Sequence, residues 1–286
     1  SVVLQCFEFQ LKCAPYILLK CKNNRFYISI LKFERMLKLK IFFIALWNIW
    51  FYFLAGFGVI LLFPVLLIAV SREKWYPALF YLAKYLWSPI ITFGMGFMPK
   101  IGISPDVDFS KKYVFVANHL SMIDIMLVLI AIPKPFVFVG KIELKKFPFF
   151  ATIYKKAAIL VNRDSYKSRK DVYKQAKRKL SFGYNIMIYP EGTVPEPHVF
   201  LGPFKNGAFS IAIEHQIPIV PITMPDNKKR FPFQFDYKYW VGKPGIARCN
   251  IHKPVPTTGL TKEELPELKK KIYTVMSDAL KEEGYC

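Results

Sequence analysis

A histidine and an aspartate lie five residues apart in segment 118–124, which reads Asn-His-Leu-Ser-Met-Ile-Asp. The preceding run, 113–117, is short, apolar and β-branched, which is typical of a buried strand. We therefore expect His119 in a strand-to-helix turn and Asp124 in the first turn of the helix. An aspartate so placed fixes the tautomer of the imidazole and stabilises the imidazolium that forms when the histidine takes a proton from an alcohol. The pair is a candidate catalytic base.

The same residues also allow a purely structural interpretation. Ser121 followed three residues later by Asp124 has the pattern of a helix capping box. Asp124 could then serve only as the capping acid, and His119 only as a turn residue. The rest of the chain has to decide between the two interpretations.

Short β-branched runs alternate with amphipathic stretches after residue 99. We expect strands at 113–117, 136–139, 159–161, 185–189, 219–223 and 246–251. We expect helices at 121–130, 148–156, 168–181, 206–216 and 261–283, the last opened by a capping box of Thr261 and Glu264. Such alternation predicts an α/β fold with a largely parallel sheet flanked by helices. Its active groups should lie at the carboxyl ends of the strands.

Two further polar clusters follow expected strands. Arg163 comes after strand 159–161 and could hold a phosphate through two parallel hydrogen bonds. The other cluster, after strand 185–189, is the triplet Glu191, Gly192 and Thr193. Its glycine would let backbone N–H groups approach an anion. Arg163 could instead pair with Asp164 at the surface, and the triplet could be an ordinary turn. Three polar clusters at one sheet edge nevertheless predict a shared cleft.

An uncharged stretch of 30 residues, 41–70, dominates the N-terminal part. Because a helix needs about 20 apolar residues to cross a bilayer, we expect this stretch in or on a membrane, with a buried core helix as the alternative. A second apolar stretch, 76–98, carries one charge, Lys84. Basic residues flank both sides of the first stretch, which favours a hairpin that enters and leaves at the cytoplasmic face over a single spanning helix.

The formal net charge is +21, and ten of the Lys and Arg residues lie within 155–179. Such density predicts an anionic partner. Nucleic acid is not expected, since no zinc finger, helix-turn-helix or RNA-binding signature accompanies the charge. Anionic lipid head groups explain it better, at about 1 kcal/mol per basic residue near the surface. A solvated helix face is the structural alternative for most individual lysines.

Cysteine usage and the N-terminal region bound the organisation of the chain. The cysteines form no C-x-x-C pair and no metal-like spacing with the four histidines, so we expect a reducing compartment or no disulfide role, and no metal. Residues 1–35 begin with serine, lack periodicity and precede Met36, which resembles a natural start. We expect 1–35 to be an upstream or non-native extension, 36–99 a membrane-anchoring helical segment, and 100–286 the α/β domain.

Four sequence blocks follow the apolar segment in a fixed order. They are 119–124; Lys-Ile-Glu-Leu at 141–144 with Phe-Pro-Phe-Phe at 147–150 and Leu-Val-Asn-Arg at 160–163; Tyr-Pro-Glu-Gly-Thr at 189–193 with Phe-Lys-Asn-Gly-Ala at 204–208; and Ile-Pro-Ile-Val-Pro-Ile at 217–222. From about residue 37 onward the chain resembles the glycerophospholipid acyltransferases of the bacterial 1-acyl-glycerol-3-phosphate acyltransferase type. The first block is similar to that family's catalytic H-x-x-x-x-D motif, and the second to its acceptor-binding block.

The chain also departs from the family pattern. Val194 stands where an arginine often follows the Glu-Gly-Thr triplet, and alanines at 151 and at 157 or 158 stand where glycines are common. Neither departure touches His119 or Asp124. Both leave the identity of the acceptor and the contacts to its phosphate open.

The resemblance implies a membrane enzyme that converts lysophosphatidic acid to phosphatidic acid in phospholipid synthesis. His119 would act as the general base, with Asp124 holding its ring, and no acyl-enzyme would form, in keeping with the absence of a G-x-S-x-G elbow in the sequence. The residues expected to hold the acceptor are Arg163, Glu191, Gly192, Thr193, Lys141 and Lys205, with Glu191 directed at a hydroxyl or a neighbouring cation. The co-substrate would be acyl-carrier protein or acyl-coenzyme A, whose negative charge the basic cluster could attract.

The expected partners are membrane lipids, lysophosphatidic acid and the thioester donor, with no cofactor beyond that donor. The expected location is a membrane, the bacterial inner membrane, with the catalytic domain at its cytoplasmic face. Two rivals stay open: an acyltransferase for another lysophospholipid or glycerol 3-phosphate, and a catalytically silent membrane-binding protein.

Overall fold

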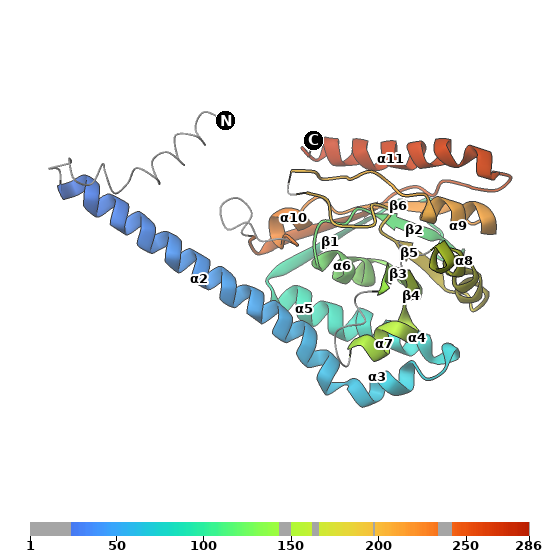
Figure 1. Ribbon diagram of the computed structural model, residues 1–286, viewed down its shortest axis with the longest axis horizontal. Helices are drawn as coiled ribbons and strands as arrows, with labels where there is room; N and C mark the ends of the chain where they lie inside the picture. The colour runs from blue at the N-terminus through green and yellow to red at the C-terminus, as the bar shows by residue number, and fades with distance from the viewer. Residues whose placement is uncertain (1–23, 143–149, 162–165, 197, 234–241, 286) are drawn as a thin grey trace. The chain divides into compact units, whose positions relative to one another are not determined.

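The computed structural model describes residues 24–142, 150–161, 166–196, 198–233 and 242–285. The chain divides into two units, residues 1–49 and 50–286. The second unit holds the sheet and all of the candidate site residues, and it begins within the long helix Asn24–Leu61, labelled α2 in Figure 1.

The first helix, α2, runs over Asn24–Leu61. Its part Lys38–Leu61 has a mean hydropathy of 1.9 and, by length and composition, is the one helix in the described ranges that could cross a membrane. Residues 24–35 belong to this helix, although their sequence shows no helical periodicity. That stretch contains neither proline nor glycine, so nothing ends the helix before the apolar segment.

The second apolar stretch is helical over residues 76–94, with a π segment in its middle, and the expected hairpin stays a prediction. After α3 (Phe63–Ala69) and a 3₁₀ turn (Glu73–Trp75), it forms α4 (Tyr76–Leu82), a π turn (Ala83–Trp87) and α5 (Ser88–Gly94). Pro77 lies in the first turn of α4, and Pro89 lies in the first turn of α5, just after the π turn, in keeping with the N–H that proline lacks. The side chain of Lys84 is buried, and its Nζ donates to the carbonyls of Leu129 and Ile130 at 3.2 and 2.6 Å.

This lysine explains why the second stretch packs on the domain. Leu129 and Ile130 lie in the last turn of α6 (Ile123–Ala131), where carbonyl groups lack helical partners and the helix dipole favours a cation. Ile91 and Met95 are also buried, and α5 packs against α6. One face of the stretch thus belongs to the core of the α/β domain.

The sheet has seven strands in the order β1-β7-β6-β2-β5-β3-β4. Their bounds are β1 Phe97–Ile103, β2 Val114–Ala117, β3 Phe136–Lys141, β4 Ile159–Val161, β5 Asn185–Ile188, β6 Ile219–Thr223 and β7 Gly245–Ile251. All neighbouring pairs are parallel except β6 and β7. The α/β fold with a largely parallel sheet is therefore confirmed, as are all six expected strands.

Strand β1 was not expected from the sequence. It lies at the end of the second apolar stretch and contains Pro99, and it pairs in parallel with β7 only. Proline is tolerated in such an edge strand because one side of the strand needs no ladder hydrogen bonds.

Helices cover both faces of the sheet. Helices α8 (Tyr166–Ser181), α9 (Gly207–His215) and α11 (Leu265–Glu282) pack together on one face, and α5 and α6 pack together on the other (Figure 1). The remaining helices are α7 (Phe150–Ala157) and the short α10 (Asn227–Arg230). The capping box of Thr261 and Glu264 before α11 is confirmed. Strand β2 is fully buried at the centre, which fixes the place where the chain leaves it.

Candidate active site

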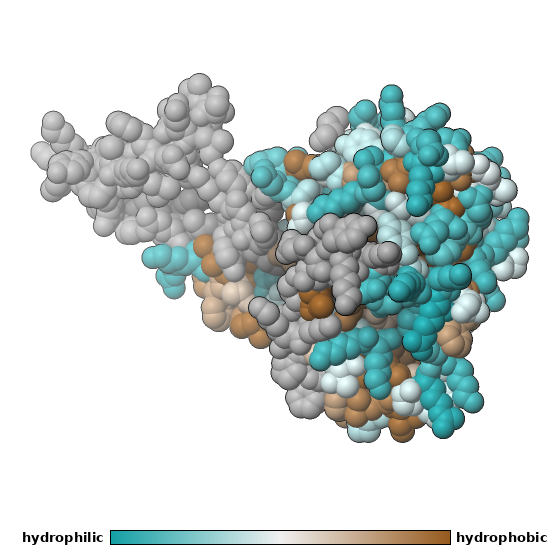
Figure 2. Space-filling view, turned by 45° about the vertical axis from the view of Figure 1, so that its right-hand side comes forward, coloured by the Kyte–Doolittle hydropathy of each residue, from teal (hydrophilic) through white to brown (hydrophobic). Residues whose placement is uncertain are grey.

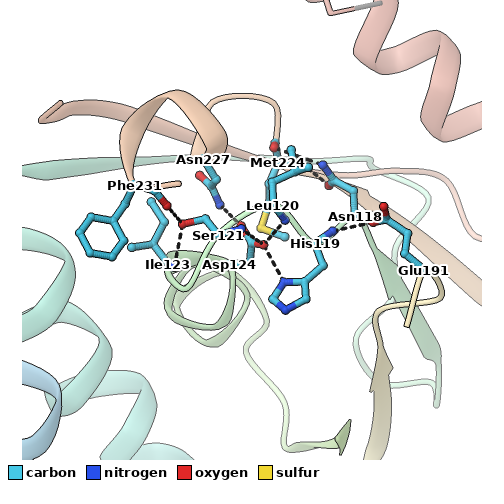
Figure 3. A network of polar contacts seen from close by, with 10 residues as sticks. All are labelled: Asn118, His119, Leu120, Ser121, Ile123, Asp124, Glu191, Met224, Asn227 and Phe231. Atoms are coloured by element: carbon cyan, nitrogen blue, oxygen red, sulfur yellow. Dashed lines mark hydrogen bonds and ion pairs between the residues drawn. The ribbon is translucent and has the colours of Figure 1, made fainter. Parts of the chain in front are cut away.

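His119 lies in the turn between β2, which ends at Ala117, and α6, which begins at Ile123. Its Nδ1 is 2.9 Å from Oδ2 of Asp124. The imidazole is 19% exposed, whereas the carboxylate is fully buried. Figure 3 shows the ring pointing away from the other polar groups, with one nitrogen turned toward Asp124. The sequence spacing thus brings the two side chains into direct contact.

The buried carboxylate of Asp124 accepts four hydrogen bonds. Besides the imidazole, Oδ2 accepts the backbone N–H groups of Leu120 at 2.7 Å and Ser121 at 2.8 Å. Oδ1 accepts the side-chain amide of Asn227 at 2.6 Å. A buried charge is costly unless such donors compensate it, so these contacts hold the carboxylate in place and fully engaged.

The two interpretations of Asp124 turn out to be compatible. Its carboxylate binds the N–H of Ser121, as a capping acid does, and also binds the imidazole. The capping box itself is incomplete, since Ser121 Oγ accepts the N–H of Ile123 at 3.2 Å and donates to the carbonyl of Phe231. The expected Ser121 half of the box is therefore wrong, because a distant carbonyl competes for that hydroxyl.

The geometry defines the tautomer of the imidazole. A carboxylate can only accept, so Nδ1 of His119 carries the hydrogen and Nε2 presents a lone pair. Within the described ranges no side chain or backbone group hydrogen-bonds to Nε2. The ring stacks on Tyr189, with centroids 4.2 Å apart and planes 18° apart. Asp124 and Tyr189 together fix the ring, and its free nitrogen can accept a proton.

Glu191 supports the same turn from the loop after β5. Its Oε1 accepts the backbone N–H of His119 at 2.8 Å, and Oε2 accepts that of Gly202 at 2.6 Å. Burial raises the pKa of this carboxyl to about 7, although the two backbone hydrogen bonds oppose the rise. A role of Glu191 toward a hydroxyl or a neighbouring cation stays a prediction. Two orphaned N–H groups of neighbouring loops take both oxygens.

The other expected acceptor residues differ in their burial and in whether the structure describes them. Gly192 has φ +75°, a conformation that favours glycine, and its N–H donates to the carbonyl of Tyr189 at 3.1 Å within the turn. Thr193 and Lys205 are exposed, and the N–H of Lys205 donates to the carbonyl of Pro190 at 2.8 Å, which brings the segment 204–208 against this loop. Arg163 and the side chain of Lys141 lie outside the described residues.

Sequence reasoning missed the contributions of α10. Asn227 supplies the fourth donor to Asp124 and is fully buried. Its neighbour Lys228 is also buried, and its Nζ donates to the carbonyls of Glu196 and Val199 at 2.9 and 2.6 Å. The polar run 226–230 follows the expected strand 219–223, so the rule that active groups follow strand ends could have found it.

An ion-pair network anchors α10 from behind. Asp226 pairs with Arg248 of β7 at 2.7 Å, and Arg248 also pairs with Glu283. Burial would raise the pKa of Asp226, but the hydrogen bonds and charge of Arg248 outweigh burial and lower it. Tyr285 donates a further hydrogen bond to Asp226 at 3.2 Å. The residue before Asn227 is thus fixed to β7 and to the end of α11.

Hydrogen bonds of the Asn118 side chain join the ends of β2 and β6. The side chain of Asn118 accepts the N–H of Met224 at 2.8 Å and donates to its carbonyl at 3.4 Å. Asn118 is fully buried. In the described part of the chain, no group of three His, Cys, Asp or Glu side chains is arranged to hold a metal ion.

Comparisons with known proteins agree with this architecture. Residues 99–225 match the sequence model of the family described as Acyltransferase. The chain is thus similar to this family over the part that carries strands β2 to β6. The matched residues include His119, Asp124 and Glu191, whereas Asn227 and Arg248 lie beyond them.

Curated relatives carry related names. The 1-acyl-sn-glycerol-3-phosphate acyltransferase of Saccharomyces cerevisiae is 29% identical over 178 residues, which cover 61% of this chain and 57% of the relative. The putative 1-acyl-sn-glycerol-3-phosphate acyltransferase acl-2 of Caenorhabditis elegans is 31% identical over 178 residues, 59% of each chain. The alignment thus spans somewhat more than half of these relatives.

The crystal structure of the 1-acyl-sn-glycerophosphate acyltransferase PlsC from Thermotoga maritima superimposes with a TM-score of 0.68 at 22% sequence identity. The match covers 86% of this chain and 98% of that one. At this identity the likeness shows a shared fold alone.

Proposed function

We propose that this protein transfers an acyl group from a thioester donor to the free hydroxyl of 1-acyl-glycerol 3-phosphate and so forms phosphatidic acid. The observation that carries the proposal is the His119–Asp124 contact of 2.9 Å, which leaves Nε2 free to take a proton. The family match and the names of the relatives in yeast and the nematode support the choice of reaction and acceptor.

In the proposed reaction, Nε2 of His119 removes the proton of the acceptor hydroxyl, and the oxygen attacks the thioester carbonyl. The imidazolium that forms is stabilised by the carboxylate of Asp124, which keeps its four hydrogen bonds throughout. Collapse of the tetrahedral intermediate breaks the carbon–sulfur bond, and the imidazolium returns its proton to the thiolate. The proton balance closes without any cofactor.

The attack is direct in this proposal, with no acyl-enzyme. Ser121, the hydroxyl nearest to the pair in sequence, is fully buried and donates its hydrogen to the carbonyl of Phe231. Its Oγ also accepts the N–H of Ile123, so it is engaged in holding the turn. We therefore assign Ser121 to the architecture of the turn.

The acceptor's phosphate and glycerol are assigned to the loops beside His119. Arg163 is the principal proposed phosphate ligand, and Thr193, the Gly192 turn, Lys205 and Lys141 are further proposed ligands of the acceptor. Glu191 is reassigned, on its contacts to two backbone N–H groups, from an acceptor ligand to a positioning residue. The donor would be acyl-carrier protein or acyl-coenzyme A, both anionic, which suits a chain of net charge +21.

We further propose that α2 anchors the protein in a membrane, with the acyltransferase domain at the cytoplasmic face, which is the inner membrane in a bacterium. The support is the apolar stretch Lys38–Leu61, which is 24 residues long. A helix of about 20 apolar residues is sufficient to cross the hydrocarbon core.

A single assay tests the proposal against its rivals. The purified full chain is reconstituted in vesicles and given a radiolabelled acyl-coenzyme A or acyl-carrier protein with a panel of acceptors: lysophosphatidic acid, other lysophospholipids and glycerol 3-phosphate. We expect turnover with lysophosphatidic acid to exceed the others and to require His119. Preference for another acceptor would identify that acceptor as the substrate in place of lysophosphatidic acid. No transfer to any acceptor would favour a silent membrane-binding protein.

A further inference from the structure

A cavity lies near the amino ends of β3, β4 and β5, away from the strand ends that carry His119. It has a volume of about 350 Å³, within the range of small-molecule sites. Its lining is Val70, Ser71, Arg72, Glu73, Tyr76, Lys155, Lys156, Ala158, Gln175, Arg178 and Lys179. We call it the basic cavity.

The amino ends of three strands locate this cavity. Ala158 immediately precedes β4, and Tyr184, which precedes β5, donates its hydroxyl hydrogen to the carbonyl of Glu73 at 2.6 Å. The hydroxyl of Tyr76 donates to the carbonyl of Phe136, the first residue of β3, also at 2.6 Å. Strands β2 to β5 are parallel, so their carboxyl ends lie together on one side of the sheet and their amino ends on the other. His119 follows the carboxyl end of β2 and therefore lies on the side away from the cavity.

The charges around the basic cavity do not cancel. Glu73 is its one acidic lining residue. Both oxygens of that carboxylate accept hydrogen bonds from Lys179 at 2.9 Å, and Arg178 lies 3.5 Å away. Arg72, Lys155 and Lys156 make no ion pair within the described ranges. A surplus of positive charge therefore faces the cavity.

Helix dipoles account for part of this charge only. Lys155 and Lys156 lie in the last turn of α7, and Arg178 and Lys179 in the last turn of α8, where cations are favourable. Arg72 belongs to neither helix. It lies in the connection after α3, with its guanidinium 5.1 Å from the ring centre of Trp75. A third segment thus adds a cation that no helix end requires.

An exposed apolar surface adjoins the cavity. Helix α3 ends one residue before Val70, and its side chains Val65 and Ile68 are 49% and 62% exposed. Trp75, at the other end of the connection, is 37% exposed. Figure 2 shows hydrophobic side chains next to hydrophilic ones at the lower end of the molecule, where Figure 1 places α3, α4 and α7. Apolar side chains bordered by tryptophan and basic residues are typical of a membrane–water interface.

We propose that the basic cavity binds the phosphate of an anionic phospholipid head group, with the acyl chains of that lipid along the exposed side of α3. Arg72, Lys155 and Lys156 are the proposed phosphate ligands. The site is distinct from the acceptor site and takes a lipid that is not turned over, so it would orient the domain on an anionic membrane.

Native mass spectrometry of the detergent-purified full chain tests this by counting bound lipids. The chain carries His119→Ala so that no lipid is consumed, which separates this test from the proposed reaction. Phosphatidylglycerol is titrated against phosphatidylcholine, and coenzyme A and inorganic phosphate are added as soluble competitors. We expect phosphatidylglycerol to bind about 100-fold more tightly than phosphatidylcholine, since each of the three cations contributes about a fivefold gain near an anionic surface.

The decisive variant carries Arg72→Gln, Lys155→Gln and Lys156→Gln, and its matched control carries Lys262→Gln, Lys270→Gln and Lys271→Gln, three exposed lysines at α11. The first should lose at least about tenfold in phosphatidylglycerol binding, and the control should lose none. Equal losses in both, or none in either, would overturn the proposal.

Two further outcomes test whether the ligand is a lipid and whether Arg72 binds it. Displacement of phosphatidylglycerol by coenzyme A or phosphate at equal concentration would make this a site for a soluble phosphate and sink the lipid assignment. The single variant Arg72→Gln, whose side chain is exposed, decides the matter if the triple variant does not fold. Unchanged binding by Arg72→Gln would reduce the cluster to compensation of helix dipoles.

Discussion

Two buried carboxylates support the candidate site from different sides, and they are held differently. Asp124, in the turn after β2, accepts four hydrogen bonds and is fully buried. Glu191, in the loop after β5, accepts two, and burial raises its pKa to about 7. The donors in the turn after β2 thus hold the Asp124 carboxylate in one position, whereas the loop after β5 contains a group that changes its charge near neutral pH.

Helix α10 touches both regions and shows what separates them. Asn227 donates to Asp124, and the next residue, Lys228, donates to two carbonyls of the loop after β5. Burial lowers the pKa of Lys228 to about 8, against the pull of Glu191. The turn after β2 is therefore bound by a neutral amide, Asn227. The loop after β5 is bound by a cation, Lys228, whose pKa is about 8. We expect changes in the turn to reduce chemistry and changes in the loop to alter stability with pH.

The largest effect should come from His119→Ala. Loss of a positioned general base typically costs about 10²- to 10⁴-fold in rate, so turnover should be abolished within the limits of the assay. Initial rates with lysophosphatidic acid in vesicles measure this, and circular dichroism serves as the check of folding. Retention of more than about a tenth of the wild-type rate would remove His119 from the mechanism.

Asn227→Ala should have the next largest effect, on kcat rather than KM. It removes the 2.6 Å hydrogen bond to Oδ1 of Asp124 and leaves that buried oxygen without a donor. Hydrogen bonds to charged groups contribute about 1.5 to 3 kcal/mol, so kcat should fall roughly 10- to 100-fold.

The matched control for Asn227 is Asn206→Ala, since Asn206 is exposed and binds Lys269 at 2.9 Å, away from the pair. Its kcat should stay within about twofold, as surface changes usually do. A rise in KM with unchanged kcat for Asn227→Ala would show that Asn227 does not act through Asp124.

Arg163→Ala should affect the acceptor and spare the donor. With Val194 where a second arginine is common in the family, the acceptor's phosphate depends more heavily on Arg163. We expect the acceptor KM to rise about tenfold or more, and the donor KM to stay within about threefold. Arg163→Lys should recover part of the loss, since an ammonium keeps the charge without the planar fork. An equal loss on an uncharged lysolipid would assign Arg163 to structure instead.

Glu191→Gln should have the smallest effect on turnover and a clear effect on the pH dependence of stability. The unfolded chain ionises Glu191 near its ordinary pKa of 4.5, while the folded chain keeps the proton up to about 7. The folded state therefore binds more protons between these values, and stability falls as pH rises through them, by about 3 kcal/mol in total. Glutamine cannot ionise, so the variant should lack this fall.

Unfolding of the detergent-purified wild type and variant at pH 5 and pH 8 measures that difference. We expect the variant to lose less stability than the wild type on going from pH 5 to pH 8. Identical changes in the two proteins would mean that Glu191 ionises in the fold as it does in the unfolded chain.

The sequence predicted the parts of the site that are local in the chain. His119 and Asp124 are five residues apart, and the turn that joins them follows from a strand and a helix with clear patterns. The partners of this turn come from far away: Asn227, Met224 and Gly202 each meet it or its support only because β5 and β6 flank β2. Pairing order is a property of the whole fold, and no local pattern encodes it.

Local hydropathy also failed to separate the two apolar stretches near the N-terminus. The stretches 41–70 and 76–98 are both strongly apolar, and both were expected to be membrane arms. The second contains a π turn just before Pro89, packs on the domain, and ends in the first residues of the unexpected edge strand β1. The buried Lys84 was the available signal, because a lone cation in an apolar run needs carbonyl partners, which the end of α6 supplies.

The central claim is that His119 and Asp124 act as one unit, and a double-mutant cycle tests it most directly. Turnover is measured for His119→Ala, Asp124→Asn and the double variant in the same vesicles. Residues that act as a unit are strongly non-additive, so the double variant should be no slower than His119→Ala alone. If the two losses multiply, the two side chains act independently, and the 2.9 Å contact between them is structural only.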